Sequence, residues 1–211
     1  MTTFVKTGKK ELNNTTPTEP FFFLKPTSSY LANHQPFHIP RNVVVHHEVE
    51  LGVIIGKPGR DITADKAYEH VAGYCLAIDY TGRNVQDAAK AKGLPWSAAK
   101  GFDEFLPIGD FIPASEIVDP HDLELWFKIG QETKQAANTN LMLYRIDKLI
   151  EHCSSIMTLE EGDLLLTGTP AGVGPVKAGD EVSAGLVQSG KELGRIQHLV
   201  KNREGGYLFK A

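Results

Sequence analysis

The stretch RNVVVHHEVELGVIIGKPG, residues 41–59, decides the fold because it is rich in β-branched residues and ends in a Pro-Gly turn. These features predict one long β-strand. Strand side chains alternate between two faces, so one face would carry valines and Leu51, and the other would carry Glu48 and Glu50. The sequence therefore predicts a strand with an apolar core face and a second face that presents two neighbouring carboxylates.

Segments on both sides of this strand predict a mixed α/β fold in which strands dominate. Residues 74–80 predict a buried strand that ends at Asp79. Further strands are predicted at 21–24, 123–130, 164–168, 180–188 and 192–200. Helices are predicted at 63–73, 84–92 and 145–157, and loops at 27–41 and 169–179. Residues 1–20 are polar and predict an N-terminal arm, which leaves residues 21–211 as a single domain.

The composition excludes several classes of protein. The chain has 211 residues and a formal net charge of −4, which argues against a nucleic-acid-binding protein with a large basic face. No stretch approaches the roughly 18 consecutive apolar residues of a membrane span. Two cysteines, Cys75 and Cys153, cannot form a disulfide framework, and the first 20 residues contain no apolar signal segment. We expect a cytoplasmic or mitochondrial protein that is not secreted.

Glu48, Glu50 and Asp79 form the first candidate site. Two carboxylates close together on one strand face repel each other where water is excluded, and a cation removes that repulsion. Ligation by carboxylate oxygens alone suits Mg²⁺, Mn²⁺ or Ca²⁺. The alternative is that both glutamates lie on a solvated sheet face, where a Glu-x-Glu pattern is common. The strongly apolar flanking sequence favours the metal site.

Two further segments carry candidate functional residues. Residues 82–103 contain Arg83, Gln86 and Lys100. An arginine can bind a carboxylate through two hydrogen bonds, and a lysine can neutralise an enolate or transfer a proton. Residues 164–180 contain the turn Thr-Gly-Thr-Pro, whose backbone N–H groups can bind an anion. The alternatives are solvated surface charges for the first segment and an ordinary turn for the second.

Four stretches together resemble the fumarylacetoacetate hydrolase superfamily, especially its small single-domain branch of acylpyruvases, oxaloacetate decarboxylases and oxaloacetate tautomerases. They are FFFLKPTSS (21–29), HHEVELGVIIGK (46–57), LAIDYTGRNVQDAAKAKGLPWSAAKGFD (76–103) and TLEEGDLLLTGTPAGVGPVKAGDEV (158–182). With the spacing between them, the resemblance covers about residues 11–185, and the combination is far more specific than Glu-x-Glu alone. It implies that residues 21–211 form a β-rich catalytic roll with a few short helices, usually in a homodimer.

The resemblance also implies a metal and its ligands. Glu48, Glu50 and Asp79 would hold one Mg²⁺ or Mn²⁺, and Lys100 would lie beside the metal as a catalytic residue. A 2-oxo acid can chelate such a metal through its carboxylate and its keto oxygen.

Four other residues match positions near the substrate in the family. Arg83, Gln86 and Thr169 match residues that contact or orient the substrate, and Lys25 matches a lysine near the mouth of the site. These assignments rest on the resemblance and not on spacing.

The chain departs from the family pattern at its start. Hydrolases of the family open with a Gly-Arg-Asn-Tyr-x-x-His-x-x-Glu stretch, in which the His and Glu activate water. Residues 10–14 match the end of that stretch, so Glu11 takes the place of the catalytic glutamate, but position 8 is Gly8 rather than histidine. Residues 1–20 are therefore expected to be an arm or the remnant of a lid. A general base contributes about 10²–10⁴-fold to a rate, so its loss affects hydrolysis more than decarboxylation or enolisation.

We predict a Mg²⁺-dependent enzyme that acts on a small β-keto or 2,4-dioxo acid through a metal-stabilised enolate. The favoured reactions are decarboxylation or C–C bond cleavage of oxaloacetate or acylpyruvates. Keto–enol tautomerisation of oxaloacetate is the first alternative because it passes through the same enolate. The sequence is also compatible with an enzyme of the family specialised for a larger natural product, and with a catalytically inactive metal-binding homodimer.

Overall fold

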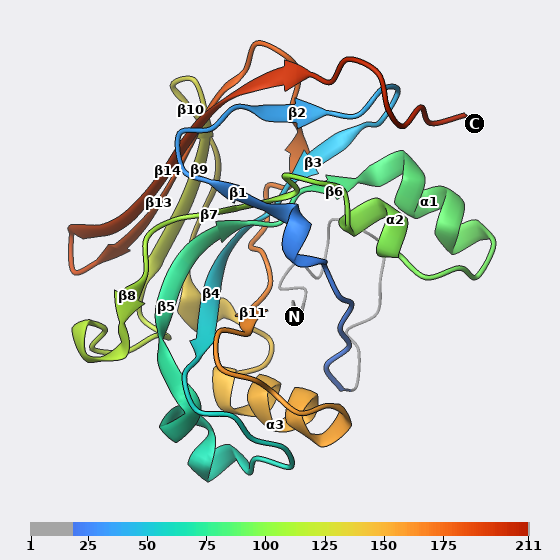
Figure 1. The fold of residues 1–211 in the computed structure, drawn as a ribbon. Helices are drawn as coiled ribbons and strands as arrows, with labels where there is room; N and C mark the ends of the chain where they lie inside the picture. The colour runs from blue at the N-terminus through green and yellow to red at the C-terminus, as the bar shows by residue number, and fades with distance from the viewer. Residues whose placement is uncertain (1–18, 211) are drawn as a thin grey trace.

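The computed structural model describes residues 19–210 and contains two large β-sheets that contact one another (Figure 1). One apolar core joins them, with Leu51 and Leu76 from one sheet and Phe127 and Ile196 from the other. The predicted strand-dominated, mixed α/β class is confirmed. Within residues 19–210, no helix is long and apolar enough to cross a membrane.

The first large sheet has six strands in the order β1-β7-β5-β4-β11, with β8 paired to β5. At its centre, β4 and β5 run antiparallel and are buried along almost their whole length, which explains their near-continuous apolar sequences. The strands are β1 (Tyr30–Ala32), β4 (Val49–Ile55), β5 (Val71–Ile78), β7 (Leu106–Ile108), β8 (Ile112–Pro113) and β11 (Leu164–Leu166).

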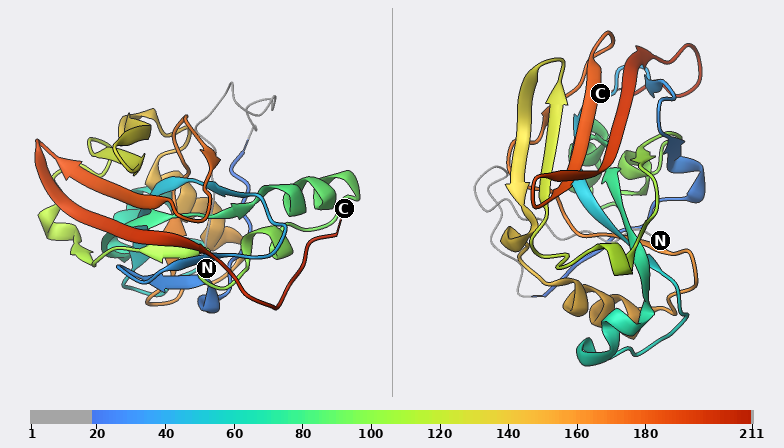
Figure 2. Two further views of the ribbon diagram at one scale, coloured as in Figure 1. Left: turned by 90° about the horizontal axis from the view of Figure 1, so that it is seen from above. Right: turned by 90° about the vertical axis from the view of Figure 1, so that its left-hand side faces the viewer.

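The second large sheet has five strands in the order β10-β9-β13-β14-β2. In β9, buried Leu125 and Phe127 alternate with more exposed residues, as expected for a sheet with one face on the core. Figure 2 shows the long β13–β14 hairpin, orange to red, curving along one side of the molecule. The strands are β2 (Phe37–Ile39), β9 (Glu124–Ile129), β10 (Glu132–Asn138), β13 (Glu181–Gln188) and β14 (Lys191–Asn202).

The predicted single strand over residues 41–59 is wrong in its continuity. Strand pairing is interrupted at Glu48, so this stretch forms two separate strands that belong to different sheets. The carbonyl of Glu48 still accepts a 2.7 Å hydrogen bond from the N–H of Asp79. Glu48 and Asp79 therefore both lie at the junction between the first large sheet and a small third sheet. The small third sheet consists of β12 (Gly174–Pro175), β3 (Val45–His47) and β6 (Thr81–Gly82).

Three α-helices in the described part of the chain flank the sheets: α1 (Arg83–Ala91), α2 (Ser97–Lys100) and α3 (Ile146–Ile156) (Figure 1). As predicted, α1 ends just before Gly93, whose φ of +64° is the left-handed conformation that favours glycine. The helix predicted at 63–73 is instead a 3₁₀ helix that ends at His70, because β5 already begins at the next residue. The 3₁₀ helices span Thr27–Ser29, Ala64–His70, Ala114–Glu116 and Thr139–Leu141.

Two predictions near the N-terminus are wrong. Residues 21–24 form no strand; the rings of Phe21 and Phe23 instead lie 5.9 and 5.6 Å from that of Trp96. Residues 27–41, predicted as a loop, contain β1 and β2, which pair in parallel with β7 and β14. Strands of three residues are too short to show alternation, and their partners are distant in sequence. Residues 1–18 of the predicted arm lie outside the described residues.

A buried histidine makes the stability depend on pH. The ring of Tyr80 stacks on Phe37 at 4.0 Å, and its hydroxyl lies 2.7 Å from Nε2 of His198. Burial lowers the pKa of His198 to about 4. The unfolded chain binds a proton below about pH 6.5 that the folded chain does not. The stabilisation is therefore complete above pH 6.5 and is lost as the pH falls toward 4.

The substitution His198→Gln tests this dependence because glutamine keeps an acceptor for the Tyr80 hydroxyl but does not titrate. The wild type is expected to lose about 1.5 kcal/mol more unfolding free energy than the variant between pH 6.5 and pH 5. Urea denaturation at both pH values measures the difference. His34→Gln, at an exposed histidine, should show the same change of unfolding free energy with pH as the wild type. An equal change in the wild type, His34→Gln and His198→Gln would contradict the prediction.

Candidate metal centre and active site

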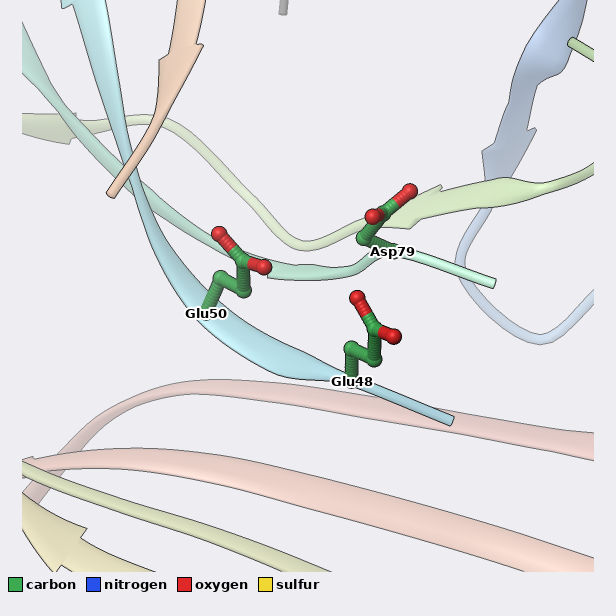
Figure 3. A group of neighbouring side chains, drawn as sticks. All are labelled: Glu48, Glu50 and Asp79. Carbon is green, nitrogen blue, oxygen red and sulfur yellow. The ribbon is translucent and has the colours of Figure 1, made fainter. Parts of the chain in front are cut away.

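Three carboxylates from separate points of the chain converge at the junction of the sheets (Figure 3). Glu48 directly precedes β4, Glu50 lies within it, and Asp79 directly follows β5. Val49 pairs with Ile78 across the two strands, so this register brings Asp79 beside Glu48. One oxygen of each carboxylate lies within 4.8 Å of the others, and all three residues are buried. The alternative of a solvated sheet face is therefore wrong.

Glu50 is the most electrostatically unfavourable of the three carboxylates. It is 0% exposed, and its Oε2 accepts a 2.6 Å hydrogen bond from the N–H of Gly168. Its Oε1 is buried without a hydrogen-bond partner among the described residues. Burial, followed by the negative charges of Asp79 and Glu48, raises the pKa of Glu50 well above its ordinary value. This arrangement leaves one carboxylate oxygen available for a ligand.

Cationic side chains neutralise the other two carboxylates. Glu48 lies 2.6 Å from Nη2 of Arg83 and 3.0 Å from Nζ of Lys100. Asp79 pairs with Lys100 through Oδ2 and lies 2.7 Å from Nζ of Lys25 through Oδ1. The side chains of Arg83 and Lys100 are only 11% and 2% exposed, so the alternative of solvated surface charges is wrong for both.

The pKa values of these two carboxylates move in opposite directions. Burial opposes ionisation of Glu48, but Lys100 and Arg83 outweigh it and hold the pKa at about 2. For Asp79, burial prevails over Lys100 and Lys25, so its pKa is raised. Glu48 is therefore the carboxylate that stays ionised most readily.

The donor set fits a hard divalent cation. Three carboxylates offer only oxygen ligands, which Mg²⁺ and Mn²⁺ prefer in proteins. A bound cation would satisfy the unpartnered Oε1 of Glu50. It would also offset the repulsion that Glu50 experiences from its two neighbours. Glu48, Glu50 and Asp79 are thus the residues that could hold the ion.

Arg83 and Gln86 lie together at the start of α1, on the side of the candidate metal centre. Residues three apart in a helix are neighbours on its surface, and Nη1 of Arg83 donates to Oε1 of Gln86 at 2.7 Å. The same guanidinium contacts Glu48 through Nη2. The structure therefore brings this predicted pair to the carboxylates, while their contact with a substrate stays a prediction.

Lys25 is buried behind Asp79. Besides its ion pair with that carboxylate, its ammonium donates to the carbonyl oxygens of Tyr80, at 3.2 Å, and of Lys100. Burial lowers the pKa of Lys25 to about 8, although Asp79 opposes the change. The structure thus places Lys25 against protein acceptors, and its predicted contact with substrate stays a prediction. The predicted catalytic residue Glu11 lies outside the described residues.

A glutamine missed by the sequence analysis connects the centre to the second sheet. Gln135 lies in β10 and is 1% exposed. Its side chain donates to the hydroxyl of Thr169 at 2.8 Å and accepts from the N–H of Val49 at 3.1 Å. The surrounding sequence, ETKQAAN, is polar and gives no signal that one of its side chains is buried beside the site. Thr169, predicted to contact substrate, is thereby held against the strand that carries the carboxylates.

Known proteins match this chain over most of its length. A family model described as fumarylacetoacetate hydrolase C-terminal matches residues 3–201. A mitochondrial oxaloacetate decarboxylase of Dictyostelium discoideum is 54% identical over 179 residues, which cover 84% of this chain and 82% of that protein. A mitochondrial oxaloacetate tautomerase of Arabidopsis thaliana is 50% identical over 195 residues, covering 92% and 86%. A solved structure of a yeast fumarylacetoacetate hydrolase family protein has a TM-score of 0.87 at 38% identity, covering 91% and 89%.

Proposed function

We propose that this chain, which belongs to the fumarylacetoacetate hydrolase family, is an enzyme that acts on oxaloacetate or a related 2,4-dioxo acid with Mg²⁺ or Mn²⁺. The observation that carries the proposal is the buried carboxylate centre with Lys100 and Arg83 against it. Decarboxylation or C–C bond cleavage is the favoured reaction. Oxaloacetate tautomerisation is the second candidate, favoured by the 50% identity to a protein of that name.

The chain's own residues supply charge and orientation for this chemistry. Arg83, held by Gln86 and Glu48, presents a guanidinium suited to a substrate carboxylate. The ammonium of Lys100 can stabilise negative charge that develops on a substrate oxygen and can return a proton to the substrate. Burial of the centre excludes water and strengthens these interactions. A divalent cation, when bound, supplies a Lewis acid that polarises the 2-oxo group.

Hydrolytic C–C bond cleavage ranks below decarboxylation in this proposal. Gly8 occupies the position of the family's water-activating histidine, and a glycine cannot act as a base. Loss of that base leaves the groups that favour enolisation in place, namely Lys100 and the carboxylate centre. We further propose that the protein acts as a homodimer in mitochondria or the cytoplasm, in line with the mitochondrial names of the two relatives.

Proton NMR of oxaloacetate and acetylpyruvate, incubated with metal-stripped protein with and without Mg²⁺, tests the proposal. Free Mg²⁺ can itself act as a Lewis acid on oxaloacetate, so protein-free Mg²⁺ is the necessary control. Pyruvate formed faster than in that control indicates decarboxylation. Faster keto–enol exchange without net loss of oxaloacetate indicates tautomerisation.

The remaining outcomes of this assay are equally informative. Acetate plus pyruvate from acetylpyruvate would show that another base replaces the missing histidine. Mg²⁺ binding without any change in either substrate would contradict the proposal and favour an inactive metal-binding protein.

A further inference from the structure

Strand β11 ends before it reaches the metal centre, and side chains continue its pairing with β4. The hydroxyl of Thr167 donates to the carbonyl of Leu51 at 2.9 Å. Two residues further on, the hydroxyl of Thr169 donates to the carbonyl of Val49, also at 2.9 Å. The Thr-Gly-Thr-Pro loop is therefore joined to the carboxylate-bearing strand by two threonine hydroxyls, together with one backbone hydrogen bond of 3.1 Å from the N–H of Thr167 to the carbonyl of Leu51.

This side-chain pairing determines the position of Gly168 and, through it, the direction of Glu50. Gly168 lies between the two threonines, and its N–H donates to Oε2 of Glu50 at 2.6 Å. If the loop moved away from β4, this hydrogen bond would lengthen. Among the described residues, Oε2 of Glu50 has no other hydrogen-bond donor, so the buried carboxylate would lose its partner. The loop thus sets the geometry of a candidate metal ligand.

Gln135 uses its whole carboxamide to fix the loop against β4. Its Nε2 donates to the hydroxyl of Thr169 at 2.8 Å and to the carbonyl of Pro170 at 2.9 Å. Its Oε1 accepts from the N–H of Val49 at 3.1 Å and lies 2.8 Å from Nδ1 of His47. Because Thr169 accepts from Gln135, its own hydroxyl proton is directed at Val49. One side chain therefore fixes both sides of the junction.

The loop also packs closely on the strand that carries Gln135. At Gly172, an added Cβ would lie 2.0 Å from the carbonyl oxygen of Lys134, and φ is +98°. Only glycine allows this approach and this backbone conformation. This close packing fixes the loop next to the buried carboxamide of Gln135. Replacing that carboxamide would leave its hydrogen-bonding partners unsatisfied, which costs free energy in a buried position.

We propose that Gln135 is a positioning residue that holds Glu50 in its ligand geometry by fixing Thr169 and Val49. The proposal rests on the metal-dependent function proposed above. Gln135 acts through the loop and the strand, in the way that residues behind metal ligands commonly set metal affinity.

Isothermal titration of Mg²⁺ and steady-state turnover of oxaloacetate test this role in two variants. Gln135→Met removes all four contacts, and Gln135→Glu keeps the acceptor for Val49 but loses both N–H donors. Both variants are expected to weaken Mg²⁺ binding by about 10–100-fold and to lower kcat/KM by a similar factor. Val182→Ala, a core truncation in the same sheet, is expected to change neither by more than about twofold.

Hydrogen exchange in the metal-free protein separates this inference from the proposed function. The N–H of Gly168 is expected to exchange at least about tenfold faster in Gln135→Met than in the wild type or Val182→Ala. An unchanged exchange rate overturns the positioning role, whatever the protein catalyses. A wild type that neither binds Mg²⁺ nor changes oxaloacetate, together with faster exchange in the variant, would overturn the proposed function alone.

Discussion

Replacing Glu50 with glutamine is expected to lower Mg²⁺-dependent turnover of oxaloacetate by about 10³-fold or more, or about 4 kcal/mol of transition-state stabilisation. The substitution removes one of three candidate ligand carboxylates while keeping an acceptor for the N–H of Gly168. It also removes a carboxyl group whose ionised form is disfavoured by burial and by the negative charges of Asp79 and Glu48. The metal-free variant should therefore unfold at a higher temperature than the metal-free wild type.

Thermal unfolding in EDTA and in excess Mg²⁺, alongside steady-state kinetics, measures both effects. The wild type should gain stability on addition of Mg²⁺ because a ligand that binds only the folded state stabilises it. The variant should lose most of that gain. Glu124→Gln, at an exposed glutamate of β9, is the matched control and should behave as the wild type. Turnover at the wild-type rate in Glu50→Gln would show that Glu50 is not a metal ligand.

The elements and site residues with local sequence patterns could be predicted. Strands β5, β9, β13 and β14 and helix α3 lie close to their predicted ranges because each carries a local apolar pattern of its own, which is near-continuous in β5. The family resemblance predicted from four stretches is confirmed by the match over residues 3–201. The carboxylates at Glu48, Glu50 and Asp79 do converge, because strand alternation and the antiparallel register of β4 and β5 place them together.

The features that could not be predicted depend on distant partners. The break at Glu48 arises because β3 and β4 join different sheets, and residue alternation alone does not reveal a change of partner. The three-residue strands β1 and β2 are defined only by pairing with strands far along the chain. Gln135 and Lys25 are polar residues whose burial follows from packing of the whole fold. Sequence patterns near them therefore could not indicate their contacts.

The substitution Asp79→Asn is expected to abolish metal-dependent activity and also to lower the unfolding free energy by about 3 kcal/mol in the absence of metal. Asp79 is fully buried and pairs with both Lys25 and Lys100. A neutral side chain would leave the buried ammonium of Lys25 with only carbonyl acceptors. The loss stays near the lower end for a broken buried pair, because burial already lowers the pKa of Lys25 to about 8 and favours release of its proton.

A double-mutant cycle separates the two roles of Asp79. Lys25→Met removes the stranded ammonium, so the pair Asp79→Asn with Lys25→Met should be more stable than Asp79→Asn alone, with a coupling of about 1–3 kcal/mol. Urea denaturation of the four metal-free proteins gives this value. Activity should not return in the double variant, because the carboxylate needed to hold the cation is still missing. Additive effects of the two substitutions on the unfolding free energy would show that the 2.7 Å contact between Lys25 and Asp79 does not stabilise the fold. Recovered turnover in the double variant would show that Asp79 is not a metal ligand.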